Sequence, residues 1–302
     1  GKRKPEITYY NTFSITRFNE AQRVLKEAID LENKAKYYYE LMPKEYKDSY
    51  YQLVYYPAVA SANIKKMQIF AGLNDYYYRQ KSVLANTYAA LIKECINADT
   101  LLQNTYNVLI SGGKWRGMMS SNHIGYVHWN DEGWQYPSIK YVTPDDKSSM
   151  IVSVEGSLAP YSSGTAKLPA FSNLNKEAYW ITISNSGNEA FDYNISTSTD
   201  WIKVDKTQGS NVIADVLSVS VDWDKLNKGA EGNITITSSC GNTVLVSITA
   251  EFTDTSGLEA MTFVEAYDIV SIEAEHFSSN IAKAGVEWKV INNYGRSLSS
   301  LK

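Results

Sequence analysis

The stretch SGGKWRGMMSSNHIGYVHWNDEGWQYP, residues 111–137, gathers the side chains best suited to chemistry in this sequence. It holds three of the seven tryptophans and two of the three histidines. Asp131 and Glu132 lie between Trp129 and Trp134, so aromatic rings could stack on a sugar while a carboxylate accepts hydrogen bonds from its hydroxyls. A solvated loop explains the same residues, and the sequence favours that interpretation.

Other kinds of catalytic centre find little support. His123 and His128 are five residues apart with a glycine between them, which does not fit the four-residue helical spacing of a zinc protease. We therefore expect hydrogen-bonded structural histidines. The sequence contains no Gly-x-Ser-x-Gly elbow, SGGKW lacks the spacing of a phosphate-binding loop, and no two of the 33 acidic residues stand out as a catalytic pair. The sequence predicts no catalytic residue, no metal and no cofactor in this chain.

Length and composition describe an ordinary globular chain of about two domains. Its 302 residues carry 29 basic and 33 acidic side chains, and the resulting formal charge of -4 does not indicate a nucleic-acid-binding protein. No run approaches the roughly 20 apolar residues of a membrane span, and no leader opens the sequence. The two cysteines fall in different expected domains, so a disulfide framework is not expected. Most of the 23 tyrosines lie in the first half, where packing between helices is favoured over a sugar-binding face.

Residues 16–110 have the apolar periodicity of amphipathic helices. Pro57 falls inside the second helix, so we expect a kink there. The sequences MPKE and AGLND predict short connections, of the length that joins antiparallel neighbours. We expect a bundle of at least three long helices. The apolar positions that define them are Phe18, Ala21, Leu25, Ala28, Ala35, Tyr39 and Met42; Tyr46, Tyr50, Leu53, Pro57, Ala60, Ile64, Met67 and Ala71; and Tyr77, Leu84, Leu91, Cys95, Ala98 and Leu102.

From residue 178 to residue 253 the apolar period changes to two. YWITISN, AFDYNISTS, VLSVSVDW, GNITITSS and TVLVSITAEF alternate apolar and polar residues between Gly, Asn and Ser turn signals. This pattern predicts a small antiparallel sandwich of immunoglobulin-like type, with Trp201 in its core. Two further runs, at residues 270–275 and 286–291, predict strands that cannot bury a sheet face alone.

The expected fold class is a multidomain chain, α then β, in which an antiparallel helical bundle precedes an Ig-like β-sandwich and a short β tail. The expected divisions are a bundle with an aromatic closing loop at 1–140, a linker with one strand at 141–177, the sandwich at 178–253, and the start of a truncated C-terminal β-sandwich at 254–302.

Two groups of motifs resemble parts of glycoside hydrolase family 115, the xylan alpha-1,2-glucuronidases. The helical region that follows the family's catalytic barrel is similar to YYQLVYYPAVASANIKKMQIFAGLNDYYYRQKSVLANTYA, residues 50–89, and to GGKWRGMMSSNHIGYVHW, residues 112–129. The opening of the family's C-terminal β-sandwich is similar to FVEAYDIVSIEAEHF, residues 263–277, and to WKVINNYGRS, residues 288–297. The middle sandwich is similar to the BACON modules that accompany carbohydrate-active enzymes of gut Bacteroidetes.

This resemblance implies a non-catalytic C-terminal accessory region of a larger hydrolase. The catalytic barrel would precede residue 1 and would be the chain's main partner, with a xylan-type polysaccharide as a further one. The chain alone would be inactive, and the protein would be exported to the periplasm or beyond by a signal peptide outside this chain. Glu273 and Glu275 match strands that carry calcium ligands in related sandwiches, but the partner strands are missing, so no metal role is carried over.

The resemblance also suggests a role for the aromatic stretch as a closing turn of the bundle. Gly112 and Gly113 would let the chain leave the third long helix in a left-handed conformation, and the residues that follow would cover the bundle end. The residues expected to contact the barrel or its substrate are Trp115, Met118, His123, Tyr126, Trp129 and Trp134.

Two alternatives remain open at this point. A secreted carbohydrate-binding protein would expose the three tryptophans of the aromatic stretch. A scaffold protein would use its tyrosine-rich helices to bind partner proteins through exposed apolar patches.

Overall fold

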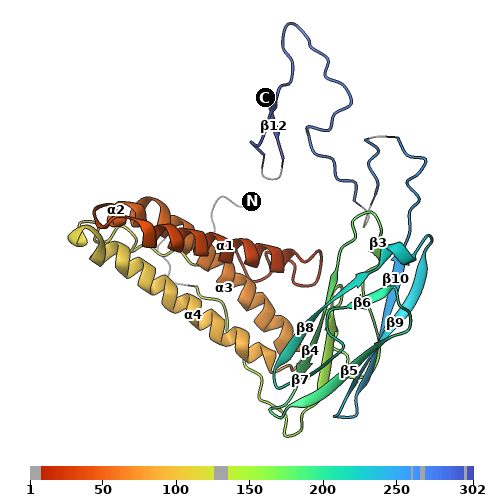
Figure 1. Ribbon diagram of the computed structural model, residues 1–302. Helices are drawn as coiled ribbons and strands as arrows, with labels where there is room; N and C mark the ends of the chain where they lie inside the picture. Colours follow the sequence, from red (N-terminus) through yellow and green to blue (C-terminus); the bar gives the residue numbers. More distant parts are fainter. Residues whose placement is uncertain (1–7, 126–134, 260, 266–268, 296–297) are drawn as a thin grey trace.

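Three long helices form the first half of the chain, and two packed β-sheets form most of the second half (Figure 1). The computed structural model describes residues 8–125, 135–259, 261–265, 269–295 and 298–302. The order of helices, sheets and a short β tail confirms the expected fold class. The helical elements are α1 (Glu20–Leu41), α2 (Lys44–Tyr50), the π-helical turn η2 (Tyr51–Tyr55), α3 (Tyr56–Arg79), α4 (Leu84–Asn104), the π-helical turn η3 (Thr105–Leu109) and the 3-10 turn η4 (Ile110–Gly113).

The central helix of the bundle is α3, which packs against both α1 and α4. It is buried on several faces, as eight consecutive buried residues at 67–74 show. The residues that α1 buries are Ala21, Ala28 and Ala35, which are small and seven residues apart, so they lie on one face and allow a close approach. The bundle thus places its bulky apolar side chains on α3 and lets α1 cover them.

A π-helical turn, wider than an α-helical one, lies just before Pro57, where the sequence predicts a kink. The π-helical turn η2 directly precedes α3, and the N–H of Tyr56 bonds to the carbonyl of Tyr51, five residues earlier. Proline lacks an N–H and its ring displaces the carbonyl four residues before it, which a wider turn accommodates. The chain therefore passes from α2 through η2 into α3 without a break in the helical path.

One of the two expected helix connections is correct and one is wrong. The helix α1 ends at Leu41, next to MPKE, whereas AGLND lies inside α3. Gly72 is used for close packing, because a Cβ there would come within 2.5 Å of the backbone oxygen of Tyr10. Asn74, with 1% of its surface exposed, bonds to backbone groups of other segments. Two residues that are typical of turns thus serve long-range contacts inside a helix.

The β region consists of two sheets that enclose one apolar core, which contains Trp201 as expected. The first sheet has the antiparallel order β1-β4-β8-β6, and the second has the order β2-β10-β9-β5-β7 with β3 beside β10. The strands are β1 (Met150–Val154), β2 (Gly164–Lys167), β3 (Phe171–Ser172), β4 (Tyr179–Asn185), β5 (Phe191–Thr197), β6 (Ile202–Val204), β7 (Gln208–Asn211), β8 (Ala214–Val221), β9 (Ala230–Ser238) and β10 (Thr243–Glu251), with the short 3-10 turn η5 (Trp223–Lys225) after β8.

Residues 141–177, which the sequence predicts as a linker with one strand, supply three strands to these sheets. The expected strand, β1, pairs antiparallel with β4, and β2 and β3 both pair parallel with β10. The strands β2 and β3 span four and two residues, between stretches rich in Ser, Gly and Pro. Segments this short show no measurable apolar period, so composition alone indicated a linker.

The bundle packs on the outer face of the first sheet at the turn between α3 and α4. The hydroxyls of Tyr77 and Thr182 lie 3.1 Å apart, and the N–H of Val83 donates to the carbonyl of Asn185 at 2.9 Å. Both faces of β1 are therefore covered, and all five of its residues are buried. The bundle and the sandwich share a polar and apolar interface in this way.

The tail after residue 254 carries the small hairpin of β11 (Val290–Ile291) and β12 (Ser300–Leu301). The run at 286–291 contributes β11 to this hairpin, whereas the run at 270–275 forms no strand. Large apolar side chains here are exposed, including Ile281 at 85% and Tyr294 at 74%. As the sequence indicated, two short strands cannot bury a sheet face by themselves.

Candidate functional site

The end of the bundle farthest from the sandwich is where α4 gives way to the closing loop. Ser111, Gly112 and Gly113 have φ angles of 51°, 63° and 81°, so the chain leaves the helix in the left-handed region as expected. The N–H of Ser111 donates to the carboxylate of Asp48 at 2.7 Å, which ties this exit to α2. The following residues are thereby directed back over the ends of the helices.

A cluster of aromatic side chains fills this end, which we call the bundle end. Its buried residues are Ala35, Tyr51, Val59, Leu102, Tyr106 and Ile110. The Tyr51 hydroxyl donates to the carbonyl of Leu102 at 3.0 Å, and burial raises the pKa of this phenol. The ring of Tyr51 stacks on that of Tyr55 with centroids 5.1 Å apart. The tyrosines of this cluster pack between helices, as the sequence favoured, whereas Tyr37, Tyr38 and Tyr46 are exposed.

The closing loop covers the cluster with two of its three large residues. Trp115 and Met119 pack against the buried cluster, whereas Met118 is 59% exposed. The indole N–H of Trp115 is buried and has no hydrogen-bond partner among the residues that the structure describes. The ammonium of Lys114 lies over the Trp115 ring, 4.9 Å from its centroid. Trp115 therefore anchors the loop, and Met118 is the side chain left at the surface.

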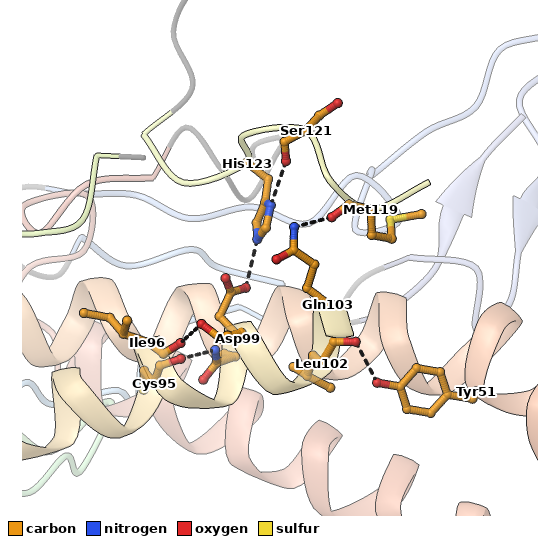
Figure 2. Close-up of polar contacts among 11 residues, drawn as sticks. Tyr51, Cys95, Ile96, Asp99, Leu102, Gln103, Met119, Ser121 and His123 are labelled. Atoms are coloured by element: carbon orange, nitrogen blue, oxygen red, sulfur yellow. Dashed lines mark hydrogen bonds and ion pairs between the residues drawn. The ribbon is translucent and has the colours of Figure 1, made fainter. Parts of the chain in front are cut away.

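A hydrogen bond between His123 and Asp99 fixes the far side of the loop (Figure 2). The Nε2 atom of His123 lies 2.9 Å from Oδ1 of Asp99, and its Nδ1 lies 3.1 Å from the carbonyl oxygen of Ser121. Asp99 is 2% exposed, and a carboxylate this deeply buried needs a charged or hydrogen-bonding partner. Both ring nitrogens of His123 face oxygen atoms, which orients the ring and leaves neither nitrogen available to a metal. The geometry agrees with the expected structural histidine.

Two more side chains from the helices hold the loop in place. The side-chain amide of Gln103 donates to the carbonyl of Met119, and the amide oxygen of Asn107 accepts from the N–H of Met119 at 2.9 Å. In Figure 2, Asp99 and Gln103 extend from α4 toward the loop, where Asp99 meets His123 and Gln103 meets the carbonyl of Met119. The loop is thus fastened through its backbone, a few residues at a time.

A cavity of about 380 Å³ lies between the loop and α3. Its walls include Tyr56, Pro57 and Ile64 from the helices and Met118 and His123 from the loop. Burial, together with the nearby carboxylate of Asp99, raises the pKa of Tyr56 to about 12, so its hydroxyl stays protonated at neutral pH. The cavity can offer hydrogen bonds and apolar surface.

The structure places three of the six residues that the sequence singles out. Trp115, Met118 and His123 all belong to the bundle end, and Met118 and His123 line its cavity. Tyr126, Trp129 and Trp134 lie outside the described residues, as do His128, Asp131 and Glu132.

Sequence reasoning missed Asp99, although a signal was present. Asp99 stands four residues after Cys95 and three before Leu102, so it interrupts an apolar helix face. An acidic residue on such a face indicates a buried partner. That the partner is His123, 24 residues further on, follows only from the fold.

Other kinds of site find no support in the described part of the chain. It contains no group of three or more His, Cys, Asp or Glu residues that could hold a metal ion. Cys95 is buried and Cys240 exposed, both are free, and burial raises the pKa of the Cys95 thiol to about 11. None of the described helices is long and apolar enough to cross a membrane.

Comparison with known proteins points to the glycoside hydrolases, through one part of the chain. Residues 262–302 match the family model of the glycosyl hydrolase family 115 C-terminal domain. No curated protein matches the sequence.

Several solved structures resemble the chain weakly. A family 115 4-O-methyl-alpha-glucuronidase with specificity for decorated arabinogalactans is 11% identical, with a TM-score of 0.30 over 77% of this chain and 33% of that one. A GH5 xyloglucanase of Bacteroides ovatus is 16% identical, with a TM-score of 0.24 over 36% of this chain and 23% of that one. A PapD-like domain of human CEP192 is 8% identical, with a TM-score of 0.26 over 42% of this chain and 99% of the domain. The chain thus spans a third or less of the two hydrolases.

Proposed function

We propose that the chain is the non-catalytic C-terminal accessory region of a glycoside hydrolase of family 115 type, a xylan alpha-glucuronidase. The observation that carries the proposal is the match of residues 262–302 to the family's C-terminal domain. The similarity of residues 50–89 and 112–129 to the helical region of the same family supports it, because these segments precede the match in the family's order. In this proposal the middle sandwich is a BACON-like module, and the whole protein is exported.

The bundle end is the surface that contacts the catalytic barrel in this proposal. The segments that meet there carry several exposed apolar side chains, with Leu53 exposed at 73%, Leu101 at 64%, Leu109 at 61% and Met118 at 59%. Exposed apolar side chains gathered in one region are typical of a surface that another domain covers. The anchored loop and the hydrogen bond between His123 and Asp99 would hold this surface in one shape before the barrel meets it.

The first test is enzymatic. The chain alone should release no 4-O-methylglucuronic acid from decorated xylan, because the acid and base would reside in the barrel. Release of the sugar acid by the purified chain would overturn the assignment as a non-catalytic region. Arabinogalactan carrying the same sugar acid serves as the second substrate.

The second test concerns the bundle end. The double substitution Leu53→Asp and Leu101→Asp should leave the stability of the chain alone unchanged, since both side chains are already exposed. In the intact gene product the same substitutions should lower the melting temperature and the activity. Val216→Asp is the matched control, because Val216 is 65% exposed on the sandwich and should change neither protein. Equal behaviour of the two variants in the intact protein would contradict the proposed contact.

A further inference from the structure

A second cavity, of about 530 Å³, lies at the other end of α1, where the N-terminal segment meets the sandwich. We call it the junction cavity. Its volume falls within the range of small-molecule sites, about 300 to 1,000 Å³. The residues whose chemistry matters here are Arg17, Phe18, Glu155, Lys167, Thr249 and Glu251, and all of them line the cavity. The function proposed above does not involve this cavity.

The backbone at the rim of the junction cavity is strained. Phe18 and Asn19 are consecutive residues with φ angles of 58° and 48°, in the left-handed region that asparagine tolerates but a bulky residue such as phenylalanine rarely adopts. The carboxylate of Glu155 holds this turn, because it accepts the N–H of Asn19 at 3.1 Å and that of Trp180 at 3.3 Å. The carbonyl of Thr16 also accepts the N–H of Gly156 at 2.6 Å. Strain of this kind, held in place by its surroundings, often marks a binding site.

The turn leaves an aromatic ring at the rim of the cavity. Phe18 is 47% exposed and lines the cavity instead of packing in the bundle core where its helical spacing suggested it would lie. A half-exposed ring beside polar groups is the arrangement that stacks against the C–H face of a sugar. The left-handed turn at Phe18 thus places this ring at the rim of the cavity.

Three of the charged side chains around the ring are accessible to a ligand. Arg17, Lys167 and Glu251 are exposed, and none of them forms an ion pair within the described ranges. Glu155 is 1% exposed and is already engaged by two backbone N–H groups, and burial raises the pKa of its carboxyl. The cavity thus offers two cations, one accessible carboxylate and one aromatic ring.

An acidic sugar satisfies these groups together. Arg17 and Lys167 call for an anion, and Arg in particular binds carboxylates with two parallel hydrogen bonds. Glu251 calls for hydroxyl donors, which sulfate lacks at neutral pH, and neither sulfate nor phosphate has a C–H face to stack on Phe18, while a neutral sugar would leave both cations without a partner. We propose that the junction cavity binds an acidic sugar, a hexuronic acid unit with its carboxylate at Arg17 and Lys167, its ring face on Phe18 and its hydroxyls near Glu251.

The test uses two ligands that differ only in the carboxylate. Methyl β-D-glucuronide and methyl β-D-glucoside are titrated into the full 302-residue chain and followed by NMR. We expect the glucuronide to bind about tenfold more tightly or better, since a hydrogen bond to a charged group is worth about 1.5 kcal/mol or more. Equal binding of both sugars, or binding of neither, would overturn the proposal. N-acetylaspartate is the third probe, and its binding as tightly as the glucuronide would show a general site for acidic peptides instead.

Variants then locate the site. Arg17→Gln and Lys167→Gln should each weaken glucuronide binding about tenfold, for the same reason, while far-UV circular dichroism stays unchanged because both side chains are exposed. Lys228→Gln removes an exposed lysine that does not line the cavity and should have no effect. Unchanged affinity in the Arg17 and Lys167 variants would exclude the junction cavity as the site. Because the assay measures binding by the chain alone, its result does not depend on whether the bundle end contacts a barrel.

Discussion

Asn74 connects three segments of the bundle, so replacing it with alanine should be the most damaging change of a polar residue in the helices. Its amide nitrogen donates to the carbonyls of Ala85 and Lys140, and its amide oxygen accepts the N–H of Lys140, all at 2.8 Å. Asn86 holds the same extended segment two residues later, through the N–H and carbonyl of Val142 at 2.9 Å. Together these side chains pair with the segment much as a neighbouring strand would.

The expected loss can be worked out from these contacts. Each hydrogen bond contributes about 1 kcal/mol net, so Asn74→Ala should lower the free energy of unfolding by about 3 kcal/mol. The backbone groups of Lys140 would lose their partners in a region that is only partly open to water. Asn86→Ala removes two bonds at a partly exposed position and should cost about 1 to 2 kcal/mol.

Urea unfolding followed by far-UV circular dichroism at 222 nm measures these changes. The control is Asn104→Ala, an exposed asparagine at the end of α4, which should cost nothing because alanine is the better helix former. A loss below about 1 kcal/mol for Asn74→Ala, or one no larger than that for Asn86→Ala, would refute the interpretation of the contacts as a clamp.

Three further predictions concern the closing loop, the contact between bundle and sandwich, and Glu155. Trp115→Ala should lower the free energy of unfolding by about 2 kcal/mol, and Met118→Ala by almost nothing, because only the Trp115 side chain packs on the buried cluster. Equal urea midpoints for these two variants would contradict the prediction. Tyr77→Phe should cost about 1 kcal/mol and loosen the bundle on the sandwich, since the hydroxyl contact with Thr182 is lost, and faster hydrogen exchange at β4 would show it. Burial raises the pKa of the Glu155 carboxyl above its usual 4.5. The stability that Glu155 contributes is therefore complete below that pH and is lost as the pH rises through the pKa of the folded state. Urea unfolding at a series of pH values should show this fall in the free energy of unfolding for the wild-type protein, and Glu155→Gln should lack it.

The β-sandwich shows where sequence patterns succeed. The run YWITISN coincides with β4 at both ends, and the runs that predicted the other long strands differ from the observed strand ends by at most two residues. Alternation is visible there because one face of each strand enters the shared core. It is absent from β1, whose residues are all buried because the bundle covers the outer face of its sheet. That contact joins segments far apart in the chain, so no local pattern reports it.

The bundle shows the same limit for turn signals. AGLND contains Gly and Asn, which commonly end helices, yet Gly72 and Asn74 serve contacts with Tyr10 and Lys140. The left-handed exit at Gly112 was readable because helix ends use local chemistry.

The candidate sites depend even more on the fold. Trp115 and His123 were recognised by residue type, whereas Arg17 and Lys167 line one cavity although they are 150 residues apart in the sequence. Residues that gather only on folding leave no spacing in the sequence to find.

The central claim, that this chain is the accessory region of a larger family 115 hydrolase, is tested most directly by sequencing the gene upstream of the codon for Lys2. The account predicts an open frame that continues upstream for at least about 250 codons, the size of a catalytic barrel, with strands and helices alternating in the encoded sequence. An in-frame stop codon directly before the start of this chain would contradict it.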